Sequence, residues 1–469
     1  TTIKTLTFGK WFNQPITSST FPTSLISLTF GESFNQPIPP GSLPSSITSL
    51  TFGYKFRQEV FVGSLPCSLT SLTFYGSYPM DKLVKAGGFP PSLIKLEGDI
   101  CHTISPGSFP MSLQSLRINN TFNETLTTRI LPPSLTSLTL GDAFNKPIDP
   151  GALGSTLTSL TFFCHFNQRI IPEMLPQSLQ ILEFGSWFNN IIDGGALPPS
   201  LTTLKFGSRF NRLLLPGVLP YSLINLSFDS NFNQPLNNAL PSSLQTLTFG
   251  VSFRQSLVNI LPPSITSITL YDSDGYSCED FSSLPITLRS LTFTYQYRRI
   301  ISPGTLPPAL LSFNGLDSVQ DITPGLLPAT LTSLMLGPST KLVDISDLHK
   351  LQYLTIPTLE QLQSFPSLHS LSITVDTRYR SVDDIPPSSL HMDSLTIYIP
   401  MNRSRQAIAF VKALTKLVPN VINYNVVVDR NGVYSYRKID KNTGVVLHRH
   451  KVDDCSSFNT IMFQRLLDN

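Results

Sequence analysis

The sequence is poor in charged residues, in tryptophan and in long hydrophobic runs. Charged residues make up 13% of the 469 residues, whereas about 25% is usual for soluble domains, so Ser, Thr, Asn and Gln must keep the chain in solution. The formal net charge is only +3. From Thr396 onward eleven Lys and Arg stand against five Asp, which leaves a net charge of −3 for the preceding part. Such a chain attracts nucleic acid and anionic membranes weakly, so neither is expected as a partner.

The cysteines and the missing catalytic motifs narrow the class of protein further. The five cysteines are odd in number, far apart and never in a C-x-x-C pair: Cys67, Cys101, Cys164, Cys278 and Cys455. This pattern favours reduced thiols and a cytoplasmic location over a disulfide framework. No apolar run approaches the roughly 18 residues of a membrane span. The motifs of serine hydrolases, P-loop proteins, kinases and zinc proteases do not occur, so we expect neither an enzyme nor a cofactor.

What the sequence has in abundance is a repeat, L-P-x-S-L-T-S-L-T-F-G-x-x-F-N-Q-P-I, from residue 1 to about 395. The commonest step is 22 residues, and the pattern becomes irregular after residue 340. A fixed period of this length predicts stacked units, here about nineteen coils, none of which can bury its own apolar face. The last leucine of the strand in each copy (isoleucine in one) is expected at Leu6, Leu28, Leu50, Leu72, Leu96, Leu116, Leu138, Leu160, Leu182, Leu204, Leu226, Leu247, Ile268, Leu291, Leu311, Leu334, Leu354, Leu371 and Leu395.

One repeat predicts its own local structure. Polar and apolar residues alternate over Ser27–Phe30, which predicts a half-buried strand with Leu28 and Phe30 inward. Gly31 is expected to let the backbone turn away, and Asn35 to form a buried ladder by hydrogen bonding the backbone of adjacent coils. The prolines make the other side too stiff and short for an α-helix. The prediction is a mostly β, right-handed leucine-rich-repeat solenoid, with a parallel sheet on the concave side and a Pro-rich, irregular convex side.

These motifs resemble the FNIP repeat, a subtype of the leucine-rich repeat, over roughly residues 1–340. The F-N-x-x-I element is clearest at Phe12–Ile16, Phe34–Ile38, Phe144–Ile148, Phe166–Ile170, Phe188–Ile192 and Phe232–Leu236. Arg replaces the ladder Asn at Arg57, Arg254 and Arg298, where we expect the ladder to be lost and the Arg to turn outward. The resemblance implies protein interaction. Some relatives carry an F-box before the repeats, and because the chain starts without Met inside a strand pattern, we expect a further segment upstream.

Two positions just past each strand vary from copy to copy, and repeat proteins place specificity where the unit varies. Both tryptophans lie there, and Trp, Tyr and Arg dominate interface energetics. The alternative is that these are solvent positions free to drift. The candidate partner-binding residues are Trp11, Tyr54, Lys55, His165, Trp187 and Arg209, with Arg437 and Lys438 of a possible basic patch near the C-terminus.

Three other patterns carry weaker hypotheses. Thr and Ser fill most outward strand positions, which suits a passive polar face but also contact with ice or a repetitive polymer. Asp272-Ser273-Asp274-Gly275 resembles the start of a calcium loop, but Ser283 stands where a bidentate Glu is needed. His448 and His450 share a strand face without enough further ligands for zinc. No metal site is predicted.

The repeat pattern ends near residue 395. The sequence of residues 396–469 predicts a small α+β module that caps the open end of the solenoid. A helix is expected over Arg403–Val418, and strands over Val421–Asp429, Val433–Ile439 and Val445–His450. The predicted function is a non-catalytic protein-binding scaffold or adaptor. The alternatives are a structural or carbohydrate-binding solenoid that contacts a repetitive polymer, and an enzyme built on the C-terminal module.

Overall fold

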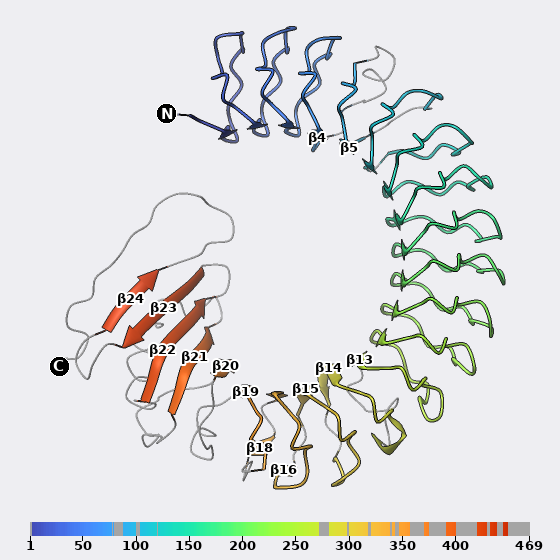
Figure 1. The fold of residues 1–469 in the computed structure, drawn as a ribbon, viewed down its shortest axis with the longest axis vertical. Coiled ribbons are helices and arrows are strands. Elements are labelled where there is room, and N and C mark those ends of the chain that lie inside the picture. The colour runs from blue at the N-terminus through green and yellow to red at the C-terminus, as the bar shows by residue number, and fades with distance from the viewer. Residues whose placement is uncertain are drawn as a thin grey trace. The chain divides into compact units, whose positions relative to one another are not determined.

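The computed structural model forms two compact units, residues 1–253 and 254–469, and each is described by itself (Figure 1). The residues described are 2–76, 78, 88–99, 104–119, 121–271, 281–297, 300–317, 320–337, 340–342, 347–356 and the strand segments 370–374, 391–399, 420–428, 432–438 and 444–448. From residue 356 onward the structure describes the backbone alone.

The first unit is a stack of short parallel strands, one in each coil. Each strand pairs in register with the next, so that Leu6 lies beside Leu28 and Leu28 beside Leu50. The strands follow the inner side of the curve of this unit and the proline-rich segments its outer side (Figure 1). They are β1 (Thr5–Thr7), β2 (Ser27–Thr29), β3 (Ser49–Phe52), β4 (Ser71–Phe74), β5 (Lys95–Gly98), β6 (Ser115–Ile118), β7 (Ser137–Leu140), β8 (Ser159–Phe162), β9 (Ile181–Glu183), β10 (Thr203–Lys205), β11 (Asn225–Ser227) and β12 (Thr246–Thr248).

The core of the first unit is built from leucine rows and stacked phenylalanine rings. Leu28 and Phe30 are buried as predicted, while the outward residues of β3 and β4 are half-buried. The rings of Phe30 and Phe34 stack within one coil with centroids 3.9 Å apart, and Phe34 stacks on Phe56 of the next coil at 6.1 Å. This pattern recurs in most coils of the unit because an F-x-x-x-F spacing returns both rings to the interior, whereas Ile118 and Leu140 replace the first ring in two coils.

The predicted asparagine ladder is present. The side-chain Oδ1 of a ladder Asn accepts a hydrogen bond from the backbone N–H of the matching residue one coil later. Asn35 donates in this way to Asn13, and Arg57 donates to Asn35, both at 2.8 Å. The ladder residues are half-buried or exposed, so the prediction of a buried ladder was wrong on that point. Arg57 still receives a ladder bond, contrary to expectation, but has no amide oxygen to continue it. Its side chain is exposed as predicted, and its Nη1 donates to the carbonyls of Tyr54 and Phe56.

A second ladder was not predicted. The Ser of the L-P-x-S-L element donates its hydroxyl to a Leu or Ile carbonyl of the preceding coil, as Ser46 does to Leu25 at 2.6 Å and Ser178 to Leu157 at 2.7 Å. Thr replaces Ser at Thr156 and keeps the bond. The signal in the sequence was that Ser or Thr recurs at this place in nearly every copy, with Ala309 as an exception. A turn alone does not require a hydroxyl residue there.

The glycines after the strands have a different role from the one predicted. A Cβ on Gly31 would meet the carbonyl oxygen of Gly9, and one on Gly207 would meet that of Gly185. Neither glycine has a positive φ. These residues therefore allow close approach of neighbouring coils, and the turn-specific glycines lie elsewhere, such as Gly151 with a φ of 75°.

The second unit continues with longer strands. The strands are β13 (Ser267–Leu270), β14 (Ser290–Tyr297), β15 (Ser312–Leu316), β17 (Ser333–Leu336), β19 (Tyr353–Ile356), β20 (Ser370–Thr374), β21 (His391–Ile399), β22 (Asn420–Val428), β23 (Gly432–Lys438) and β24 (Gly444–His448). The strands from β13 to β22 in this list pair in parallel, each with the next. The last three, β22, β23 and β24, pair antiparallel, so β22 has one parallel and one antiparallel neighbour. A separate parallel pair joins β16 (Asp321–Ile322) to β18 (Lys341–Leu342), and η1 (Phe281–Ser283) is a 3-10 turn.

One predicted strand position was wrong. Phe313, and not Leu311, pairs with Leu291 on one side and with Leu334 on the other. Phe313 is fully buried, whereas Leu311 is half-buried. Leu310 and Leu311 stand side by side, and only the frame that begins at Leu310 keeps the L-x-x-F spacing that points both residues inward.

The predictions for the C-terminal module are tested only in part. The three predicted strands are confirmed within one or two residues by β22, β23 and β24. The helix over Arg403–Val418, the acidic loop at Asp272–Gly275 and His450 lie outside the described residues. The boundary near residue 395 and the capping role stay predictions. The described residues contain no helix with the length and hydrophobicity that a membrane span requires.

Candidate partner-binding surface

The variable positions form a regular column along one edge of the sheet. Where the structure describes both residues, the N–H of the second variable residue donates to the carbonyl of the first variable residue one coil earlier, as Trp187 does to Cys164 and Arg209 to Ser186, both at 2.9 Å. Because this backbone ladder fixes the spacing, side chains of successive coils can stack directly on one another.

Three of the predicted residues come together in this column. The rings of His165 and Trp187 have centroids 4.9 Å apart, and the Arg209 guanidinium lies 3.7 Å from the centroid of the Trp187 ring. His165 belongs to the preceding coil and Arg209 to the following one, so they cover the indole from its two sides. The His165 Nδ1–H donates to the carbonyl of Asp142 at 2.6 Å, which fixes the ring. Trp187 remains 44% exposed.

Two titratable groups stand beside this stack. Burial raises the pKa of the Cys164 thiol, and the neighbouring Asp142 raises it further, so the thiol stays protonated near neutral pH. Partial burial raises the pKa of Asp229, but hydrogen bonds from Ser208 and Ser230 outweigh this and hold the pKa below its usual range. The carboxylate of Asp229 is therefore ionised and already bound to two serine hydroxyls.

The predicted residues of the first coils lie on the same column but form separate contacts. Trp11 is 77% exposed, with the Lys10 Nζ 5.4 Å from its ring centroid. Tyr54 stacks on Tyr75 with centroids 6.0 Å apart. Lys55 is exposed, and its backbone N–H joins the column.

Charged residues on the strand faces were missed by the sequence reasoning. Arg117 pairs with Glu97 at 3.4 Å, and its guanidinium lies 4.8 Å from the Phe163 ring centroid, two coils away. Lys205 pairs with Glu183 at 2.6 Å. The signal was present in the sequence, because these four charged residues interrupt a row of outward Thr.

Together these groups define a central strip on the first unit. It crosses β5 to β10 and the column beside them, and it combines two ion pairs with two guanidinium–aromatic contacts. The central strip consists of Glu97, Arg117, Phe163, His165, Glu183, Trp187, Lys205 and Arg209.

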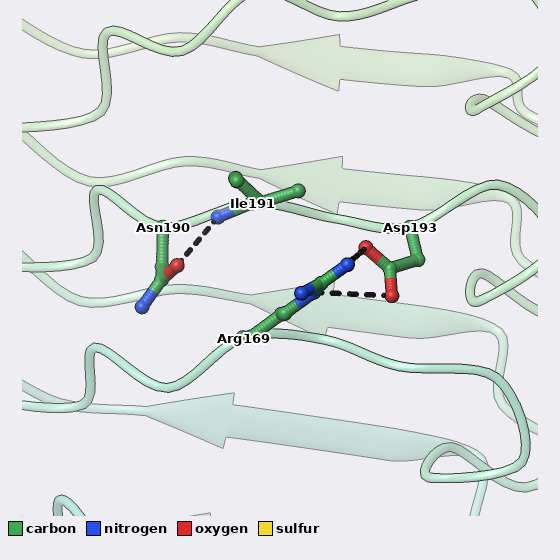
Figure 2. A network of polar contacts seen from close by, with 4 residues as sticks. All are labelled: Arg169, Asn190, Ile191 and Asp193. Carbon is green, nitrogen blue, oxygen red and sulfur yellow. Dashed lines mark hydrogen bonds and ion pairs between the residues drawn. The ribbon is translucent and has the colours of Figure 1, made fainter.

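A second surface in the same coils was also missed. Figure 2 shows the ion pair between Arg169 and Asp193 of the next coil, with Arg169 Nη2 2.9 Å from Asp193 Oδ1, beside Asn190. Four exposed aliphatic side chains occupy this flank: Ile171, Ile191, Leu213 and Leu215. Most other coils have Pro or a polar residue at these positions.

The remaining predicted residues, Arg437 and Lys438, lie at the end of β23, where they pair with Val445 and Gly444. Whether their side chains form a basic patch stays a prediction. The described residues hold no group of three or more His, Cys, Asp or Glu arranged for a metal ion.

Comparison with known structures places the fold among leucine-rich-repeat proteins. The crystal structure of CroV588, described as a novel circular LRR protein structure, matches with a TM-score of 0.56 and 28% identity over 91% of this chain and 73% of that chain. YopM from Yersinia enterocolitica matches with a TM-score of 0.40 and 18% identity, covering 85% of each chain. InlJ from Listeria monocytogenes matches with a TM-score of 0.34 and 14% identity, covering 81% of this chain and 70% of that chain.

The sequence comparisons give one family and no curated relative. No curated protein matches this chain significantly. The FNIP repeat matches residues 2–33, 34–77, 102–143, 122–165, 166–209, 188–231, 210–252 and 232–273. These matches cover more than half of the chain, and they include the F-N-x-x-I elements that build the asparagine ladder. The chain is therefore a member of the FNIP repeat family with a leucine-rich-repeat solenoid fold.

Proposed function

We propose that this chain is a non-catalytic protein-binding scaffold or adaptor, and that the central strip is its principal contact surface. Leucine-rich-repeat solenoids of this kind typically act in protein interaction and not in catalysis. The proposal includes a cytoplasmic location, which agrees with the free thiols of Cys67 and Cys164. It keeps the predicted column residues as contacts and adds the charged residues of the strand faces.

The observation that carries the proposal is that the strip is already ordered before any partner binds. Arg209 is held on Trp187, and Arg117 on Phe163 and Glu97. Ordering a flexible side chain on binding costs about 0.5–1.5 kcal/mol, so side chains fixed in advance reduce that cost. Trp and Arg are also the residue types that dominate protein interfaces. The neighbouring Ser/Thr faces offer neither advantage.

The same geometry weakens the carbohydrate-binding alternative at Trp187. A sugar ring stacks on a bare aromatic face, but His165 and Arg209 cover the indole from its two sides. Trp11 keeps more open surface. The test is to measure polysaccharide binding in plain buffer by the wild type and by the double variant Trp11→Ala with Trp187→Ala. Binding by the wild type that the double variant loses would overturn the protein-binding proposal.

Affinity capture from cells that make the protein tests the proposal. The full chain is compared with a double variant, Arg117→Gln with Trp187→Ala, and with a control, Arg169→Gln with Leu213→Ala, on the flank of the same coils. We expect a small set of proteins that the wild type and the control hold and the strip variant loses. Proteins lost equally from both variants, or held by all three, would count against the strip.

A further inference from the structure

We infer that the partner segment bound by the central strip presents an Asp or Glu carboxylate to Arg209. This inference rests on the proposed function and names the chemistry of the partner. It is argued from three observations: the other cations of the strip have carboxylate partners, Arg209 is held on the Trp187 ring, and the nearby carboxylate of Asp229 is already hydrogen-bonded by serines.

Arg209 is the unpaired cation of the strip. Arg117 has Glu97 as its partner and Lys205 has Glu183. Among the residues that the structure describes, no carboxylate lies within ion-pair distance of Arg209. The ionised Asp229 of the next coil is taken up by Ser208 and Ser230 instead.

The stacking of Arg209 prepares it for a carboxylate. With its planar guanidinium 3.7 Å from the Trp187 ring centroid, one face is covered while the N–H groups around its edge remain free to donate. Two parallel N–H groups match the two oxygens of a carboxylate, a geometry that a lysine ammonium cannot reproduce. Because the side chain is already fixed, little further ordering accompanies binding.

The local charge favours a monoanion over a phosphate group. One free guanidinium balances one carboxylate, whereas a phosphate carries close to two negative charges at neutral pH. The ionised Asp229, which accepts a hydrogen bond from Ser208 next to Arg209 in the chain, adds negative charge in the same region and disfavours the more highly charged group. A protein source is favoured over an acidic polysaccharide because the Trp187 faces are covered. The occupant is therefore an acidic peptide segment.

A displayed library of random 12-residue peptides, selected on the full chain, tests this inference. Enriched peptides are measured against wild type, Arg209→Gln, Arg209→Lys and Trp187→Ala. Arg212→Gln is the matched control, an exposed Arg of the same coil that donates to the carbonyl of Asn189. Circular dichroism confirms that each variant keeps the wild-type fold.

We expect an Asp or Glu at one fixed position of the enriched peptides. Arg209→Gln should weaken binding by about 10- to 100-fold, as for other hydrogen bonds between charged groups, and Arg209→Lys should recover only part of this loss. Arg212→Gln should bind like wild type. Replacing the acidic residue of the peptide by its amide should weaken binding to wild type but not to Arg209→Gln.

Other outcomes separate this inference from the proposed function. Peptides that need Trp187 but bind Arg209→Gln normally would overturn the carboxylate and leave the strip as a binding surface. Tighter binding of a phosphoserine version of the peptide, or its displacement by alginate, would overturn the acidic peptide as occupant. Failure to enrich any peptide that depends on Trp187 or Arg209 would overturn this inference and count against the strip itself.

Discussion

Replacing Gly207 with alanine tests how closely the coils are stacked. The added Cβ would meet the carbonyl oxygen of Gly185 and lie 2.8 Å from the backbone nitrogen of Ser186. Both are backbone atoms, so no rotamer change can relieve the overlap and the two coils would have to separate. Overpacking usually costs about 1–3 kcal/mol. Because two stacked backbones must move here, we expect the upper end, about 3 kcal/mol.

Two other glycines serve as matched controls. Gly9 occupies the same place in the first coil, but its added Cβ would have no atom within 4 Å. Gly9→Ala should be neutral, or stabilising by up to about 1 kcal/mol, because alanine restricts the unfolded chain. Gly151 has a φ of 75° with no close neighbour, so Gly151→Ala should cost about 1–2 kcal/mol through backbone strain alone.

Urea unfolding followed by far-ultraviolet circular dichroism gives the ranking of the three variants. Hydrogen exchange of peptides that span residues 180–210 then shows whether the loss is local, as expected when each coil contacts only its neighbours. A Gly207→Ala protein that unfolds at the same urea concentration as Gly9→Ala would refute the close-approach argument. It would restore the simpler view that the glycine only eases the turn.

Three further perturbations probe the ladders, the core and the charges. Ser178→Ala should lower the free energy of unfolding in urea by about 1 kcal/mol, because the carbonyl of Leu157 loses its hydrogen-bond donor. Ser178→Thr should be nearly neutral, since Thr156 makes the same bond in its own coil. Equal losses in the two variants would contradict the serine ladder. Phe144→Ala should cost about 3–5 kcal/mol, because the ring is fully buried in the stack; a loss below about 1 kcal/mol would contradict that packing. The lowered pKa of Asp229 contributes stability above its usual value of 3.8 that is lost as the pH falls through the folded-state pKa. The stability advantage of wild type over Asp229→Asn should therefore shrink between pH 6 and pH 2, and an advantage that grows with acidification would show the opposite sign.

The fold could be predicted from the sequence because the alternation of polar and apolar residues within each repeat locates its strand. The alternation over Ser27–Phe30 fixes the two inward residues, and the period fixes which coil they stack on. The local frame failed only where two leucines stood side by side, at Leu310 and Leu311. The role of Gly31 could not be found in this way, because the clash that requires it comes from Gly9, one full coil earlier.

The candidate surface was predictable in part, for a related reason. Variation at the column pointed to His165, Trp187 and Arg209, and the 22-residue period placed them one coil apart. That they would form one stack depended on the backbone ladder, which the sequence does not display. The contact between Arg117 and Phe163 could not be predicted, because it spans two coils and depends on the direction of a long side chain.

The central claim is that a partner protein lies on the central strip, and site-directed photo-crosslinking tests it most directly. A photoreactive residue is placed at Ile181 or Ser227, on strand faces within and beside the strip, and at Gln177 or Asn237, exposed positions in the proline-rich segments of neighbouring coils. The account predicts discrete crosslinked proteins from the first pair that disappear with the strip variant, Arg117→Gln with Trp187→Ala. Crosslinks from Gln177 and Asn237 alone, or strand-face crosslinks that the strip variant leaves unchanged, would contradict it.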